Sequence, residues 1–123
     1  MQETTLPIAR LAKQNSHFRR VVMTGGKAQV VLMSIPEGQD IGAETHEGHD
    51  QILFFVEGSG IAEVDGVKTE VGPGDMSFVP SGAYHNFINN GEGPLKLFTT
   101  YSPPEHEAGT EHATRKEAHA AEA

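Results

Sequence analysis

Short apolar runs alternate with turn-forming residues from Phe18 to Tyr101, and this alternation restricts the possible folds more than any other feature. The breaks contain pairs such as Asp65-Gly66 and Asn90-Gly91, whose glycines supply the positive φ angles that tight turns need. So many short strands within one stretch of chain are typical of a β-sandwich or a β-barrel. The expected strands are Phe18–Met23, Ala28–Ile35, Glu44–His46, Gln51–Glu57, Gly60–Val64, Lys68–Val71, Met76–Val79, His85–Asn89 and Leu95–Tyr101.

The two ends of the chain have a different texture. Residues 1–17 are mostly polar, with a short helix expected from Thr5-Leu6-Pro7 to about Lys13, because proline is tolerated in a first helical turn. After Pro103-Pro104, residues 105–123 are rich in Glu, His, Ala and Lys and nearly lack large apolar side chains, so we expect a solvated tail, with at most a frayed helix over 113–121. The chain therefore divides into an N-terminal arm (1–17), one barrel domain (18–102) and a polar C-terminal tail (103–123).

The composition excludes several classes of protein. The formal charge is −8, from 17 acidic and 9 basic residues, which is opposite to the balance of a protein that binds nucleic-acid phosphates. No cysteine is present, so neither disulfides nor zinc–thiolate sites can form. The longest fully apolar run, Ile52–Val56, is far shorter than the roughly 18–20 residues of a membrane span, and Met1–Arg20 has no apolar signal segment. We therefore expect a soluble, cytoplasmic protein without nucleic-acid or membrane partners.

The strand Gln51–Glu57 has apolar residues on both of its faces. Gln51, Leu53 and Phe55 would point into the barrel, and the alternate residues between them would point outward. A strand that is apolar on both faces is buried on both faces. A partner subunit is the simplest cover for the outer face, so we expect a homodimer. The alternative cover is the N-terminal segment, folded back over the sheet.

Four polar side chains of the barrel segment can converge on one point. Glu44 and His46 are two residues apart on an expected strand, so their side chains point to the same face. The four residues after His46 fit a hairpin loop, which would place Gln51 opposite His46 on the next strand. His85, after the turn Pro80-Ser81-Gly82, adds a second imidazole. Two imidazoles, one carboxylate and one amide oxygen suit a divalent ion of borderline softness.

Each of these residues also has an ordinary structural role when it is taken alone, and the other histidines compete with them. His49, in the expected hairpin loop, is the alternative to Gln51 as the fourth ligand. The remaining histidines lie outside the strands that carry the donors and are expected at the surface: His17, His106, His112 and His119.

The spacing of the donors resembles the two-part pattern of the cupin family. The first part is Gly, five residues, His-x-His, three or four residues, Glu, six residues and Gly, and it corresponds here to Gly38, Glu44-Thr45-His46, Gln51 and Gly58. The second part is Gly, five residues, Pro-x-Gly, two residues, His, three residues and Asn, and it is matched throughout by Gly74, Pro80-Ser81-Gly82, His85 and Asn89. The segment Pro103–His112 also resembles the ending of many small cupins.

This resemblance to small single-domain bacterial cupins of the mannose-6-phosphate isomerase-like type implies a fold and a metal. The implied fold is all-β, a single antiparallel cupin barrel, also called a double-stranded β-helix or jelly roll. The implied cofactor is one divalent ion per chain (Fe, Mn, Ni or Zn) on Glu44, His46, Gln51 and His85. Glu44 replaces the first histidine of the pattern and Gln51 replaces its glutamate, which leaves the reaction type open.

A divalent ion with one carboxylate and three neutral ligands keeps a net charge of about +1, which favours an anionic substrate. Few basic residues are available to hold a phosphate, so we expect a metal-dependent protein that acts on a small hydroxy, keto or carboxylate compound. Phosphomannose isomerases, which are also cupins, use the same four donor types in another order, and non-haem iron oxygenases use two histidines and one carboxylate. We therefore expect an enzyme that catalyses dioxygenation or isomerisation. The alternative is a non-catalytic metal- or small-ligand-binding or sensor module, because the sequence shows no obvious additional acid–base pair.

Overall fold

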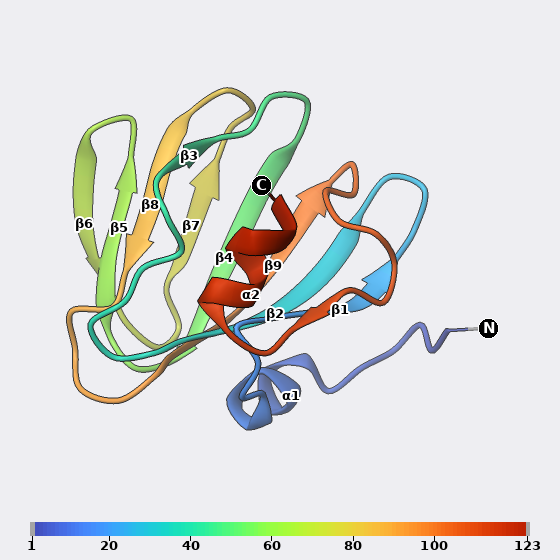
Figure 1. Ribbon diagram of the computed structural model, residues 1–123, viewed down its shortest axis with the longest axis horizontal. Helices are drawn as coiled ribbons and strands as arrows, with labels where there is room; N and C mark the ends of the chain where they lie inside the picture. Colours follow the sequence, from blue (N-terminus) through green and yellow to red (C-terminus); the bar gives the residue numbers. More distant parts are fainter. Residues whose placement is uncertain (1, 123) are drawn as a thin grey trace.

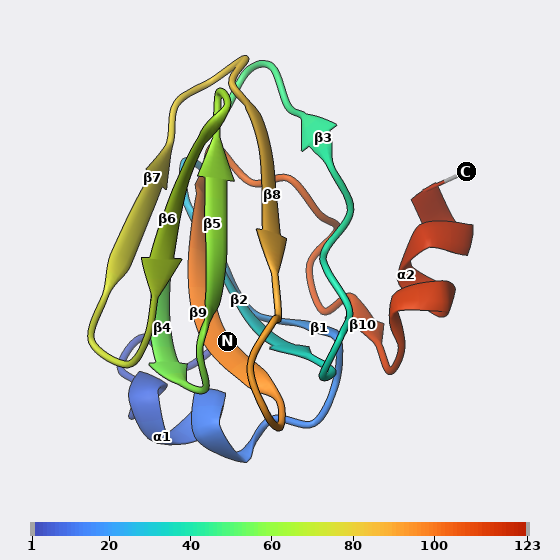
Figure 2. The ribbon, with the colours of Figure 1, turned by 90° about the vertical axis from the view of Figure 1, so that its left-hand side faces the viewer.

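Two antiparallel β-sheets face each other in the computed structural model, which describes residues 2–122 (Figures 1 and 2). The larger sheet has six strands in the order β10-β1-β2-β9-β4-β7, and the smaller has four in the order β3-β8-β5-β6. The elements are α1 (Ile8–Gln14), β1 (Arg19–Thr24), β2 (Gln29–Ile35), β3 (Glu44–Thr45), β4 (Asp50–Glu57), β5 (Gly60–Val64), β6 (Val67–Val71), β7 (Met76–Val79), β8 (Tyr84–Ile88), β9 (Leu95–Ser102), β10 (Glu111–His112) and α2 (Arg115–Glu122).

The prediction of an all-β fold is confirmed. Every predicted strand forms, and its bounds differ from the expected ones by at most one residue. The two sheets remain separate rather than closing into one continuous ladder, which is the double-sheet form of a jelly roll. The core fills the space between the sheets with large apolar side chains from both of them: Val31, Met33, Ile35, Leu53, Phe55, Phe87, Leu95 and Leu97.

The predicted alternation along β4 is also confirmed. Gln51, Leu53 and Phe55 are buried, whereas the residues between them are only partly covered. Part of the outer face is covered by α1, which packs against β9, β2 and β4. Ala12 of α1 and Leu32 of β2 are both buried at this contact. The N-terminal segment therefore supplies some of the cover that the apolar outer face needs.

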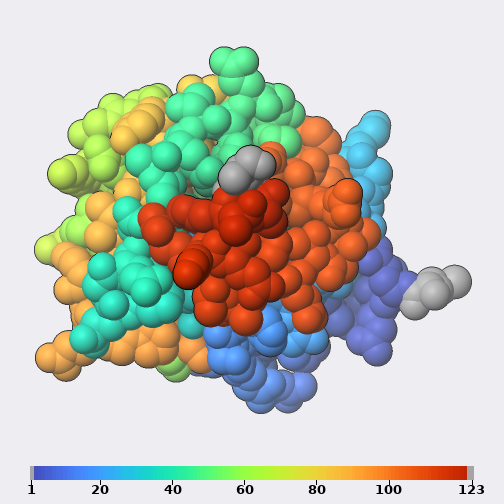
Figure 3. Space-filling view, viewed as in Figure 1, coloured from blue at the N-terminus to red at the C-terminus, as the bar shows by residue number. Residues whose placement is uncertain are grey.

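The C-terminal segment folds against the barrel, although a solvated tail was expected. Residues of β10 pair with β1 through backbone hydrogen bonds, and α2 places Ala118 in the hydrophobic core. In the space-filling view this segment, coloured orange to red, covers the middle of the face that looks toward the viewer (Figure 3). Strand pairing through the backbone does not depend on large apolar side chains, which explains why the composition hides it.

Neither helix is long and apolar enough to cross a membrane, within the part of the chain that the structure describes.

Candidate metal site

The inward-facing rows of the sheets are apolar toward one end and polar toward the other. On β9, Leu95 and Leu97 are followed by Thr99 and Tyr101, and all four side chains are buried. Gln51 of β4 pairs opposite Tyr101, so the polar residues of the two strands are neighbours. The side chains that could bind a ligand or a metal ion therefore lie at the polar end of the barrel interior.

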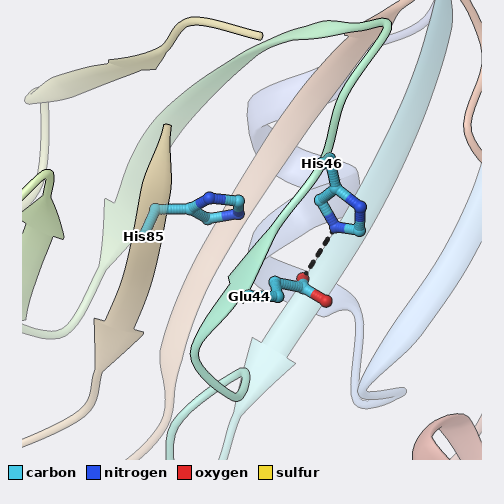
Figure 4. A group of neighbouring side chains, drawn as sticks. All are labelled: Glu44, His46 and His85. Carbon is cyan, nitrogen blue, oxygen red and sulfur yellow. Dashed lines mark ion pairs between the residues drawn. The ribbon is translucent and has the colours of Figure 1, made fainter. Parts of the chain in front are cut away.

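Three of the four predicted ligands lie together at this end. Glu44 of β3 pairs opposite His85 of β8, and His46 directly follows β3. His46 Nε2 is 3.0 Å from Glu44 Oε1, and the rings of His46 and His85 have centroids 5.5 Å apart. One donor atom from each residue lies within 4.8 Å of the others. Figure 4 shows the three side chains pointing toward one another.

A set of loop hydrogen bonds holds His46 beside the turn that precedes His85. The backbone N–H of Gly82 donates to the His46 carbonyl oxygen at 2.8 Å. The Ser81 hydroxyl accepts from the Gly48 N–H at 2.9 Å, and the Ser81 N–H donates to Asp50 Oδ1 at 3.0 Å. The loop after β3 and the turn before β8 are therefore fixed to each other, which fixes the two imidazoles.

His85 provides the test of whether these residues suit a metal ion. The side chain is 0% exposed, and its Nδ1 lies 3.0 Å from the Ala83 carbonyl oxygen. A carbonyl can only accept, so Nδ1 carries the proton and Nε2 holds a lone pair. That Nε2 is buried and has no hydrogen-bond partner among residues 2–122. A buried imidazole oriented by a backbone carbonyl, with its other nitrogen unsatisfied, is the usual arrangement of a metal-binding histidine.

The Glu44 carboxyl group keeps its charge in this setting. Burial raises its pKa, but the hydrogen bond with His46 and the positive charge of the neighbouring side chains outweigh burial, so the net pKa lies below the ordinary value. The guanidinium of Arg19 also contributes to this lowering of the pKa. A carboxylate beside two imidazoles fits the donor preferences of Fe, Mn, Ni and Zn.

The predicted hairpin that would place Gln51 opposite His46 is wrong. β3 pairs with β8 in the smaller sheet, whereas β4 belongs to the larger sheet and pairs with β7 and β9. The loop after β3 crosses from one sheet to the other, so its two ends cannot pair with each other. Gln51 accordingly approaches the site from the facing sheet.

The amide group of Gln51 is oriented by two neighbours on β9. Its Nε2 donates to Thr99 Oγ1 and to Tyr101 Oη, each at 3.1 Å. The Thr99 hydroxyl donates its own proton to the Ile52 carbonyl oxygen at 2.8 Å, so it must accept from Gln51. Both N–H groups of the amide are thus used, and Oε1 is the end left for another ligand. Coordination of a metal by Gln51 remains a prediction.

His49 and Glu105 form a second group of donors with His46. The His49 Nε2 contacts the Glu105 carboxylate, and His46 Nδ1 is 3.6 Å from Glu105 Oε1. His49 Nδ1 also lies 3.2 Å from the Pro103 carbonyl oxygen. Sequence reasoning missed Glu105 because it falls in the expected tail; the similarity of the Pro103–His112 segment to other cupin endings was the available signal.

His106 was expected at the surface, but its ring nitrogen Nε2 is buried. Gln29 holds the backbone of Glu105 and His106 against β2 through hydrogen bonds to both residues. Burial, together with the positive charge of Arg19, lowers the pKa of His106 to about 4, so its imidazole is neutral near pH 7. His119 is likewise held in the fold, where it contacts the Ile41 carbonyl oxygen at 3.0 Å.

Comparisons with known proteins agree with this fold. The family model described as "Cupin domain" matches residues 31–101. The YrkC protein of Bacillus subtilis is 42% identical over 121 residues, which cover 94% of this chain and 65% of YrkC. This chain therefore spans just under two thirds of the length of that relative.

Two further proteins are similar to this chain. The crystal structure of BH2720 from Bacillus halodurans has a TM-score of 0.95 and 38% identity, over 97% of this chain and 95% of that one. An oxalate-binding protein of Thermotoga maritima is 31% identical over 65 residues, 53% of this chain and 54% of that protein. From the facing antiparallel sheets, the matched domain and these relatives, we conclude that the chain belongs to the cupin family.

Proposed function

We propose that this protein binds one divalent metal ion through Glu44, His46, Gln51 and His85, and that it is a metal-dependent enzyme for a small oxygenated compound. The observation that carries the proposal is His85, whose protonated Nδ1 faces a carbonyl while its buried Nε2 has no hydrogen-bond partner within residues 2–122. An unsatisfied polar atom in such a place costs about 1–3 kcal/mol, which a bound ion would remove.

The proposed ligands set both the net charge of the metal centre and the orientation of its donor atoms. When bound, a divalent ion supplies a Lewis acid that polarises an oxygen of the substrate. Glu44 contributes the one negative charge of the set, so the ion and its four ligands keep a net charge of about +1. Thr99 and Tyr101 orient the Gln51 amide so that its oxygen is available. A centre with this charge favours a substrate with an anionic oxygen.

We infer dioxygenation or isomerisation of a small hydroxy, keto or carboxylate compound as the reaction, with Fe, Mn, Ni or Zn as the ion. The similarity to an oxalate-binding protein supports a small carboxylate as the ligand class. The same similarity favours the second candidate function, a non-catalytic binding or sensor module, because that relative is named for binding.

We further propose that two copies of the chain associate through the outer face of the larger sheet. Phe54 and Phe98 stack there with ring centroids 4.9 Å apart. Beside them on β7, Phe78 is 49% exposed and Met76 is 56% exposed. Aromatic and methionine side chains are enriched in protein interfaces, which supports a homodimer.

Metal analysis of the purified protein tests the central proposal. After loading with Zn²⁺ or Mn²⁺ and desalting, we expect about one ion per chain in the wild type and loss of most of it in His85→Ala. His17→Ala, which removes an imidazole outside both donor groups, should keep the metal. Full metal occupancy in His85→Ala would contradict the assignment. Oxygen-uptake and product screens with each loaded metal then separate an enzyme from a binding module, which would bind a small molecule without turnover.

A further inference from the structure

A buried arginine lies beside the proposed metal site and has no part in holding the metal. Arg19 of β1 is only 4% exposed, and it faces the same side of the strand as the core residue Val21. Arg20, on the opposite face, is exposed and pairs with Glu111 at 3.3 Å. Arg19 pairs opposite Met33 of β2, which belongs to the core, so its side chain enters the barrel interior.

His112 of β10 helps to hold this guanidinium. Arg19 pairs opposite His112, and its NH1 lies 3.5 Å from His112 Nδ1. A guanidinium can only donate, so Nδ1 of His112 accepts and its ring proton sits on Nε2. The contact restrains the long side chain, so that less conformational entropy is lost when the guanidinium binds a ligand.

His106 presents a second polar atom to the same region. Its ring packs edge-on against Tyr101 with centroids 5.3 Å apart, and Tyr101 Oη in turn accepts from Gln51. Its Nε2 is shielded from water and has no hydrogen-bond partner among the described residues. The contacts of Tyr101 with His106 and Gln51 place this imidazole at the polar end of the barrel interior. A buried polar atom without a partner calls for a ligand that supplies one.

The charges around the site favour an anion once the metal is present. The divalent ion and Arg19 bring three positive charges, and Glu44 and Glu105 bring two negative ones. About one positive charge therefore remains, and an unpaired charge in a partly buried site is energetically unfavourable. One guanidinium with one neutral imidazole suits a planar carboxylate, which accepts the parallel N–H groups of arginine. A phosphate, with about two negative charges, would need more cations than are there.

We propose that Arg19 and His106 form an anion-binding subsite for the carboxylate of a small hydroxy or keto acid, whose neighbouring oxygen faces the metal ligands. This inference rests on the proposed metal site and adds the substrate class and the residues that recognise it. Arg19 would donate paired N–H groups to the carboxylate, and the neutral His106 imidazole would donate its Nε2–H to one of the carboxylate oxygens.

Calorimetric binding to the Zn²⁺-loaded protein tests this subsite. The probes are lactate, pyruvate and oxalate, with lactamide as the neutral match for lactate. We expect lactate to bind at least tenfold more tightly than lactamide. Arg19→Met should remove at least tenfold of the lactate affinity without changing the zinc content, and His106→Phe, which keeps an aromatic ring, should remove about threefold. Arg20→Met, on the exposed face of the same strand, should change the affinity less than twofold.

The outcomes separate this inference from the proposed function. If the wild type takes up no zinc, the proposed metal site fails before any acid is added. If zinc binds but no acid is preferred over lactamide, or if Arg19→Met and His106→Phe both bind lactate like the wild type, only the subsite is overturned. Should Arg19→Met fail to fold by circular dichroism, the acid–amide comparison and His106→Phe still decide the matter.

Discussion

Gln29 and His106 are joined across 77 residues of sequence by two hydrogen bonds: the Gln29 amide donates to the His106 carbonyl oxygen at 2.7 Å and accepts from the His106 N–H at 3.0 Å. The same amide donates to Thr24 Oγ1 at 3.0 Å and accepts from the Glu105 N–H at 3.2 Å. All four hydrogen-bonding positions of the side chain are therefore used, and Gln29 is 0% exposed. The buried Gln29 amide thus fixes the backbone segment that positions Glu105 and His106 near the candidate metal site.

Gln29→Leu should destabilise the fold by about 2 kcal/mol, because it leaves the buried backbone groups of residues 105 and 106 without partners. Chemical denaturation in urea measures the free energy of unfolding. Gln39→Leu, a change at an exposed glutamine, should cost less than about 0.5 kcal/mol. Equal costs at the two positions would mean that the Gln29 hydrogen bonds do not anchor the C-terminal segment.

Local patterns in the sequence were enough to place the strands. Alternating burial and turn residues act within a few positions, so β5 (Gly60–Val64) and β7 (Met76–Val79) were predicted with their observed bounds. The motif residue Asn89 also has a local explanation, because its side chain donates to the carbonyl oxygens of Ile35 and Gly93, each at 2.9 Å, and closes the turn after β8.

Relations between distant segments were not predictable in the same way. The sheet to which Gln51 belongs depends on the path of the loop after β3, and the four-residue spacing fits a hairpin equally well. The burial of His106 depends on Gln29 and on backbone pairing between β1 and β10. Neither interaction can be recognised from the sequence immediately around His106. The candidate metal donors Glu44, His46 and His85 could be selected from the sequence because the cupin pattern includes their joint spacing, whereas Arg19 belongs to no such pattern.

Stability at acid pH should depend on Asp40, which ties the loop before β3 to α2. Partial burial raises its pKa, but a hydrogen bond from Asn86 and the ion pair with Arg115 at 2.8 Å outweigh burial and hold the pKa below 3.8. A carboxyl group with a lowered pKa stabilises the fold above its ordinary pKa and loses that contribution as the pH falls through the folded-state value. The stability difference between wild type and Asp40→Asn should therefore shrink from pH 6 to pH 3.

Thermal unfolding followed by circular dichroism at several pH values measures this difference. Glu92→Gln, at an exposed carboxylate, serves as the control and should run parallel to the wild type. A gap between wild type and Asp40→Asn that widens on acidification would contradict the stabilising role of the charged Asp40.

The docking of α2 should depend on Ala118, which is buried against the core while Ala120 on the same helix is exposed. Ala118→Asp places a carboxylate in an apolar environment and should cost at least about 2 kcal/mol, or detach the helix. Ala120→Asp introduces the same residue at the surface and should be nearly neutral. Hydrogen exchange of β10 and α2 measures the detachment, and equal protection in both variants would show that Ala118 does not hold the helix.

The proposed dimer should depend on Phe78. Phe78→Glu introduces a charge into the outer apolar face, so we expect the variant to be a monomer under conditions where the wild type is a dimer. Tyr84→Glu changes another half-exposed aromatic residue, on the smaller sheet, and should leave the dimer intact. Light scattering at micromolar concentration reports the mass, and a wild type that scatters only as a 13.2 kDa species would remove the dimer proposal.

Gln51 gives the sharpest test of the metal site, because a carboxylate replaces the amide with little change in shape. Gln51→Glu adds a negative charge beside the ion, so we expect metal affinity to rise about tenfold. The net charge of the centre then falls to about zero, and anionic ligands should bind less well.

The substitution Gln51→Glu should destabilise the metal-free protein. A carboxylate cannot donate to Thr99, whose proton already goes to Ile52, so the metal-free Gln51→Glu variant should lose about 1–3 kcal/mol of stability. Gln51→Leu should weaken metal binding only moderately, because water can replace the amide oxygen. Titration with a competing chelator measures the affinities, and urea denaturation of the metal-free proteins measures the stability. If both variants bind metal like the wild type, Gln51 is not a ligand, and His49 becomes the residue to test next.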